Sequence, residues 1–150
     1  MDKQLEYQLV WGHVDRLVNR RQNTTTIYLS VNAAIITVVA FVLSDAPLTG
    51  WLQLGALTLL LVSGIVVCDL WRRTIIQYKE LIKWWYRYLR EIEYGIAGNN
   101  AMVSREYHEL YEDGAGKGRV GLTRYEIRLT WLFIMLYLIF IVATFVLAFI

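Results

Sequence analysis

The stretch that decides the fold is the uncharged run APLTGWLQLGALTLLLVSGIVVC, which occupies residues 46–68 and is bounded by Asp45 and Asp69. Two further uncharged runs lie at residues 24–44 and 129–150. A helix rises about 1.5 Å per residue, so about 20 apolar residues cross a hydrocarbon core of roughly 30 Å. Each run has at least 21 residues. The sequence therefore predicts an all-α membrane protein with three transmembrane helices.

The composition of the chain agrees with a membrane class. Of its 150 residues 57% are hydrophobic, which is more than soluble domains of this length usually contain. The first run is not expected to be a cleaved signal peptide, because 23 residues precede it and its apolar core is too long. Cys68 is the single cysteine, which excludes an internal disulfide and any cysteine-based metal cluster.

The positions of the charges predict the orientation. All 15 basic residues fall within residues 1–23 and 70–128, whereas the turn between the first two runs holds only Asp45. Basic residues are retained on the cytoplasmic side of a membrane. The N-terminus and residues 70–122 are therefore predicted to be cytoplasmic, and the C-terminus to lie outside.

Residues 1–22 have the pattern of an amphipathic helix. Tyr7, Val10, Val14 and Leu17 recur at spacings of three and four. Two interpretations remain open: the helix lies on the membrane surface, or it packs on the cytoplasmic region.

Four arginines are predicted to lie at the membrane interface. Long cationic side chains near the end of a span can extend to the headgroups while their stems stay in apolar surroundings. They are Arg20 and Arg21 before the first span, and Arg72 and Arg73 after the second.

The second span is expected to continue into the cytoplasm as a long helix, because no glycine or proline interrupts residues 65–94. A short helix at about residues 101–112 would then fold back on it as a hairpin. The predicted organisation is an N-terminal helix at residues 1–22, spans at residues 24–44, 46–69 and 124–150, and a cytoplasmic helical region at residues 70–122.

Large apolar residues form a seam along this long helix at alternating spacings of four and three, the heptad pattern of a coiled coil. The two short partner helices are too small to bury all of these side chains, and surplus apolar surface marks an interface. The sequence thus predicts self-association through this seam. Its members are Trp71, Ile75, Tyr78, Ile82, Trp85, Leu89 and Ile92.

The predicted spans contain few polar groups. Ion-coupled carriers need charged or titratable side chains at membrane depth, and the first span offers only Asn32 besides its hydroxyls. A carrier is therefore not expected. For Asn32, three roles stay open: it faces a pore, it makes a hydrogen bond between helices, or it makes a local hydrogen bond within the hairpin of the first two spans.

No motif supports catalysis, a metal, a cofactor or nucleic-acid binding. The spacing Gly116-x-Gly118-x-x-Gly121 matches a dinucleotide fingerprint by letter, but no strand is predicted before it. His108 lies between Glu106 and Glu109 on a polar helix face, without the arginine spacing of HEPN-type ribonucleases. The chain is expected not to be an enzyme.

Three segments together resemble a known family. They are TIYLSVN at residues 26–32, the stretch at residues 71–93, and GLTRYE at residues 121–126 followed by LTWLFIMLY. Their order and spacing are similar to the RipA-type octameric small membrane proteins of bacteria, and the hairpin is similar to SLATT-type membrane effectors. This resemblance implies a ring-shaped homo-oligomer in the bacterial inner membrane and supplies no catalytic residues.

Two functions compete at this stage. The first is a non-enzymatic homo-oligomeric assembly that forms a pore or a gated membrane effector. The second is a membrane adaptor that recruits a soluble cytoplasmic protein through residues 70–128 and conducts nothing.

Overall fold

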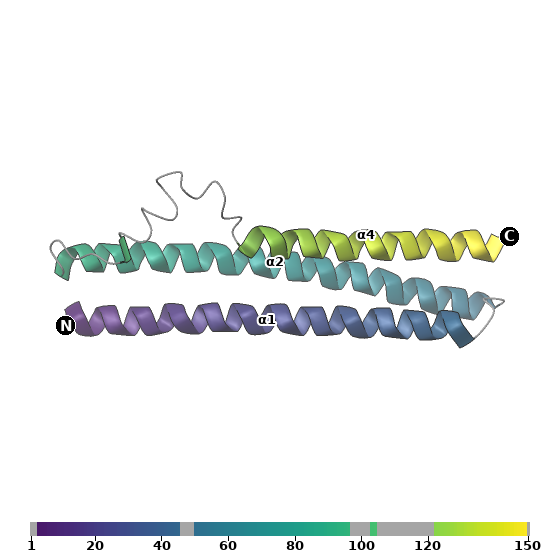
Figure 1. The fold of residues 1–150 in the computed structure, drawn as a ribbon, viewed down its shortest axis with the longest axis horizontal. Helices are drawn as coiled ribbons and strands as arrows, with labels where there is room; N and C mark the ends of the chain where they lie inside the picture. Colours follow the sequence, from purple (N-terminus) through teal and green to yellow (C-terminus); the bar gives the residue numbers. More distant parts are fainter. Residues whose placement is uncertain (1–2, 46–49, 97–102, 105–121, 150) are drawn as a thin grey trace. The chain divides into compact units, whose positions relative to one another are not determined.

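The computed structural model describes residues 3–45, 50–96, 103–104 and 122–149. These residues form three long helices: α1 (Lys3–Asp45), α2 (Trp51–Ile96) and α4 (Leu122–Phe149) (Figure 1). The described part is therefore all-helical, as predicted. All three helices are long and apolar enough to cross a membrane.

Both α1 and α2 continue well beyond the uncharged runs. The amphipathic helix and the first span were predicted as separate segments, but α1 contains both as one helix of 43 residues. Neither glycine nor proline occurs between Gly12 and Asp45, so nothing in the backbone chemistry ends the helix there. The predicted short helix at residues 101–112 lies outside the described residues, except for Val103 and Ser104.

The chain divides into two compact units. Unit 1 comprises residues 1–23 and 76–125, and unit 2 comprises residues 24–75 and 126–150. Both α1 and α2 contribute residues to each unit.

Unit 1 has an apolar core to which its parts of α1 and α2 both contribute. Val10, Val14 and Leu17 on α1 are buried. Val10 shares a cluster with Leu89 of α2 and Val103, which half-buried aromatic side chains surround. Residues spaced three and four apart lie on one face of a helix, so Val10, Val14 and Leu17 share one face of α1.

Two carboxylates connect separate segments of unit 1. Glu93 is buried and accepts hydrogen bonds from the backbone N–H of Val103 at 3.0 Å and of Ser104 at 2.9 Å, and from the Ser104 hydroxyl at 3.0 Å. Glu6 accepts a bond of 2.6 Å from the Tyr88 hydroxyl. This bond and the charge of Glu6 raise the pKa of Tyr88 above its usual value.

Unit 2 contains residues of all three long helices. Val39 of α1, Leu57 and Leu61 of α2, and Tyr137 of α4 belong to one buried cluster. Large apolar side chains remain exposed on the outside of the same unit, among them Leu59, Ile139 and Val142. An exterior of this kind fits a lipid environment better than water.

Replacing Glu93 by Ala should release the segment at Val103 and Ser104. The substitution leaves two N–H groups and one hydroxyl without their acceptor, at a cost of about 1–3 kcal/mol. We expect faster hydrogen exchange at the Ser104 amide, measured by mass spectrometry on the detergent-solubilised protein. Glu91, which is exposed on the same helix, provides the control, because Glu91→Ala should leave the exchange unchanged. Equal exchange rates in the Glu93 variant and the unsubstituted protein would contradict the anchoring role of Glu93.

Candidate functional site

The most distinctive site of unit 2 is a buried polar cluster where α1, α2 and α4 meet. Asn32 on α1 is fully buried. Its Oδ1 atom accepts a hydrogen bond of 2.8 Å from the Tyr137 hydroxyl of α4 and one of 3.1 Å from the Cys68 thiol of α2. Its Nδ2 group donates to the Tyr28 carbonyl at 2.8 Å. One side-chain oxygen thus receives a donor from each of the other two helices.

The sequence repeat places these residues on the inner faces of their helices. On α4, the buried residues Thr130, Tyr137 and Thr144 follow each other at intervals of seven. On α1, the interval from Asn32 to the buried Val39 is also seven. Two helical turns take about seven residues, so each set lies along one face.

A glycine allows the Tyr137 ring to enter the cluster. A Cβ atom built on Gly64 of α2 would lie 2.5 Å from Cζ of Tyr137 and 2.7 Å from Cε1. Real Cβ atoms do not approach other carbons so closely, so any larger residue at this position would displace the ring. Small residues permit such close packing between membrane helices.

The cluster can position helices but contains no carboxylate, histidine or basic side chain of the kind that ion-coupled carriers use at membrane depth. Its members are a carboxamide, a phenol and a thiol, all of which are uncharged donors or acceptors. An unpaired polar group in hydrocarbon is costly, so the three partners disfavour separation of the helices. In the structure, Asn32 makes hydrogen bonds to the other two helices of its own chain.

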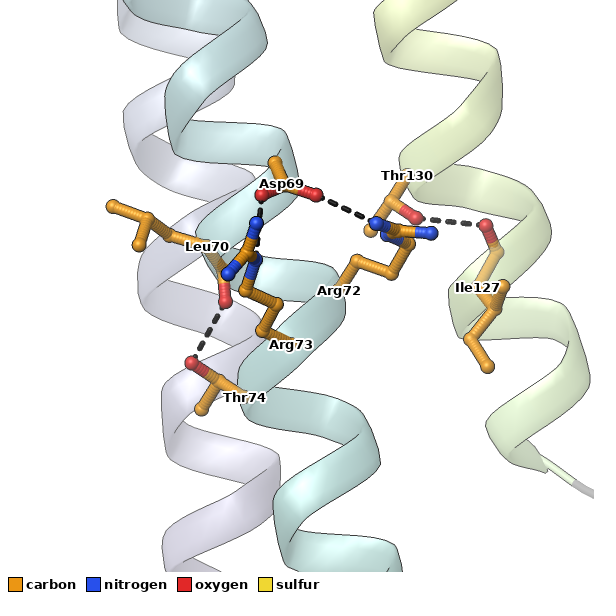
Figure 2. Close-up of polar contacts among 7 residues, drawn as sticks. All are labelled: Asp69, Leu70, Arg72, Arg73, Thr74, Ile127 and Thr130. Carbon is orange, nitrogen blue, oxygen red and sulfur yellow. Dashed lines mark hydrogen bonds and ion pairs between the residues drawn. The ribbon is translucent and has the colours of Figure 1, made fainter.

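A second polar group lies at the end of the uncharged run of α2. Asp69 accepts hydrogen bonds from Nη2 of Arg72 and from Nε of Arg73, both at 2.7 Å (Figure 2). The Arg72 guanidinium also lies over the Trp131 ring of α4, 5.5 Å from its centroid. A cation over an indole face is attracted by the ring quadrupole. Two of the four predicted interface cations, Arg72 and Arg73, are thus held by the same carboxylate, Asp69.

The other two predicted interface cations lie on α1 in unit 1. Arg21 donates a hydrogen bond of 3.1 Å to the Thr123 hydroxyl of α4. Arg20 is exposed on the same helix. Glu126 of α4, within unit 2, is buried and accepts a bond of 3.3 Å from Thr25.

The predicted interface seam is largely turned toward the chain itself. Trp71, Ile75 and Leu89 are at most 2% exposed. Tyr78, Ile82, Trp85 and Ile92 are half-buried. The Trp71 ring stacks on Tyr28 of α1 with the centroids 6.0 Å apart. In this conformation, a second copy could reach only the half-buried members of the seam.

Sequence reasoning missed the partners of Asn32 and the role of Gly64, although a signal for α2 exists. The alternating spacing of the seam extends backward from Trp71 through Cys68, Gly64, Leu61 and Leu57, all of which are buried. A seam that continues unbroken through a span indicates packing within the chain as well as between copies.

The residues considered for an enzyme or a nucleotide site cannot be placed. Glu106, His108, Glu109 and the glycine-rich stretch at residues 116–121 lie outside the described residues. Within the part of the chain that the structure describes, no three His, Cys, Asp or Glu side chains are grouped in a way that could hold a metal ion.

The chain matches the model of a known protein family. The model of the Octameric membrane protein family (8xMP) matches residues 4–146, which include the described parts of α1 and α2 almost completely and most of α4. No curated protein and no solved structure matches the chain significantly.

Replacing Gly64 by Ala should destabilise unit 2, because the new methyl group would force the Tyr137 ring away from Asn32. Overpacking of this kind costs about 1–3 kcal/mol. We expect a lower midpoint of thermal unfolding in detergent, measured by circular dichroism. Gly55 on the same helix is the matched control, since nothing lies within 4 Å of a Cβ atom built there. Gly55→Ala should leave the midpoint unchanged or raise it slightly. Equal midpoints for the two variants would contradict the close fit at Gly64.

Proposed function

We propose, since the chain belongs to the octameric membrane protein family (8xMP), that eight copies form a ring in the bacterial inner membrane. The ring acts as a pore or a gated membrane effector, with the N-terminus and unit 1 on the cytoplasmic side. The family match over residues 4–146 is the observation that carries this proposal.

The exposed aromatic surface of unit 1 supports contact between copies. Leu81 is 43% and Trp84 is 53% exposed, and both lie outside the three uncharged runs. Lipid tails are therefore not expected to cover them. The spacing of three residues puts them on one face of α2. An apolar patch that lies in water marks a protein contact.

This patch is built on a rigid base of aromatic rings. The Trp84 ring stacks on Tyr88 at a centroid distance of 6.0 Å and meets Trp85 edge-on at 4.9 Å. The Trp85 ring in turn lies 4.5 Å from His13 of α1. Because neighbouring rings and the Tyr88–Glu6 bond fix its position, Trp84 loses little side-chain entropy on binding. Such rigid aromatic side chains are favoured at interface centres.

The geometry of a ring indicates how this surface is used. Successive copies in a ring meet through two different surfaces, one on each side of the subunit. We propose that Leu81 and Trp84 of one copy pack against another face of its neighbour. The half-buried seam residues Tyr78 and Ile82 would lie at the edge of this contact.

A membrane adaptor is the second candidate function. The same exposed patch could bind a soluble cytoplasmic protein, with the spans serving only as an anchor. Passage of solute separates the two candidates, because an adaptor leaves a vesicle sealed.

Trp84→Asp should dissociate the assembly, since a carboxylate in the centre of an apolar contact loses its hydration without gaining a partner. Native mass spectrometry in mild detergent measures the result. Trp84→Phe should keep the high-order species, because the apolar ring is retained. Ile82 and Trp85 are less suitable for this test: both are half-buried in unit 1, and a charge there would disturb the protomer itself. An assembly that survives Trp84→Asp with unchanged mass would contradict this interface.

Vesicles that contain the unsubstituted protein should release an encapsulated small fluorescent dye. The Trp84→Asp variant, reconstituted at the same density, should release it no faster than protein-free vesicles. The assay is repeated with a membrane potential applied across the vesicles. If the protein is fully assembled and the vesicles stay sealed under both conditions, the result contradicts the pore and favours the adaptor.

A further inference from the structure

We propose that Arg72 and Arg73, oriented by Asp69, form a binding site for the phosphate group of an anionic phospholipid. The site lies on α2 within unit 2, where the uncharged run of residues 46–68 ends. This inference does not depend on the pore, because a single protomer already contains all three residues.

The hydrogen bonds of Asp69 do not use the terminal nitrogens of Arg73, whereas Nε of Arg72 is buried. Asp69 engages only Nε of Arg73 and only one terminal nitrogen, Nη2, of Arg72. The Arg73 side chain is 69% exposed and that of Arg72 is 33% exposed. Both terminal nitrogens of Arg73 are thus available to a ligand. A guanidinium group forms paired, charge-assisted bonds to phosphate oxygens.

The position of the site matches the depth of a lipid headgroup. The last uncharged residue of the run is Cys68, so the charged sequence that follows begins at the edge of the predicted hydrocarbon layer. Trp131 of α4 is half-exposed beside Arg72. Tryptophan side chains concentrate at the membrane–water interface.

The charges around the site leave it positive. Unit 2 contains Arg72, Arg73 and Arg128 near this end, against the carboxylates Asp69 and Glu126. Glu126 is buried and bonded to Thr25, whereas Arg128 is exposed. Arg128 precedes Trp131 by three residues and so shares its face of α4. A headgroup phosphate at Arg72 and Arg73 would also be attracted by Arg128.

Asp69 distinguishes a built site from a general positive surface. Its two bonds at 2.7 Å hold both arginines in fixed directions (Figure 2). Asp69→Asn removes a negative charge, so a nonspecific attraction of anionic lipid should become stronger in this variant. If the orientation of the arginines matters, the same substitution should weaken binding, because an amide holds two guanidinium groups less firmly than a carboxylate does.

The experiment is native mass spectrometry of the detergent-solubilised protein, titrated with phosphatidylglycerol or with phosphatidylcholine. We expect preferential retention of phosphatidylglycerol, and about tenfold weaker retention in Arg73→Gln and in Asp69→Asn. Arg87→Gln is the matched control, since Arg87 is exposed on the same helix within unit 1, and it should retain the lipid normally. Thermal midpoints of all variants check that the protein remains folded.

Two results would overturn the proposal. One is stronger phosphatidylglycerol retention in Asp69→Asn, which would indicate nonspecific attraction. The other is an equal loss in Arg87→Gln and Arg73→Gln. A competition experiment with inorganic phosphate separates a lipid site from a site for free phosphate. Displacement of the lipid by millimolar phosphate would assign the site to free phosphate. Persistence of the bound lipid supports a headgroup site.

Discussion

The side chain of Asn32 lies fully buried at membrane depth, where every unpaired polar group is costly, and this constraint organises the spans. Its oxygen accepts from Tyr137 and Cys68, and its amide nitrogen donates to the Tyr28 carbonyl. Removing any one helix from the others would leave at least one of these groups without its partner. Apolar contacts give little preference for one arrangement in lipid, since the tails are as apolar as leucine, so these hydrogen bonds give unit 2 a specific register.

Packing around the cluster follows from that register. Gly64 has to be small because the Tyr137 ring occupies the space in which a side chain would stand. The spacing that places Gly64 and Cys68 inward on α2 continues to Trp71 and beyond, so one heptad pattern supplies the buried face in both units. The adjacent face of α2, which carries Trp84, remains exposed. Asp69, which holds Arg72 and Arg73, directly follows Cys68 in the sequence.

The sequence was sufficient for the class of fold and insufficient for the contacts. Three uncharged runs specify three spans by length alone, and the family resemblance agrees with the match over residues 4–146. The heptad pattern predicts self-association through the seam, and the seam residues Trp71 and Leu89 are buried within the chain itself. A heptad pattern gives the apolar face of a helix but does not tell which helix covers it. The role of Tyr137 could not be predicted for a related reason. Its hydroxyl donates a hydrogen bond to Asn32, which lies more than 100 residues earlier in the sequence, and the sequence pattern does not indicate that the two residues are neighbours.

A double-mutant cycle between Asn32→Val and Tyr137→Phe tests the central claim that this cluster couples the three helices. Unfolding free energies of the four proteins would be measured in mixed micelles by titration with a denaturing detergent. A direct hydrogen bond of 2.8 Å predicts a coupling energy of about 0.5–2 kcal/mol, with the double variant less destabilised than the sum of the single ones. Additive effects, within about 0.3 kcal/mol, would show that the two side chains act independently and would contradict the account.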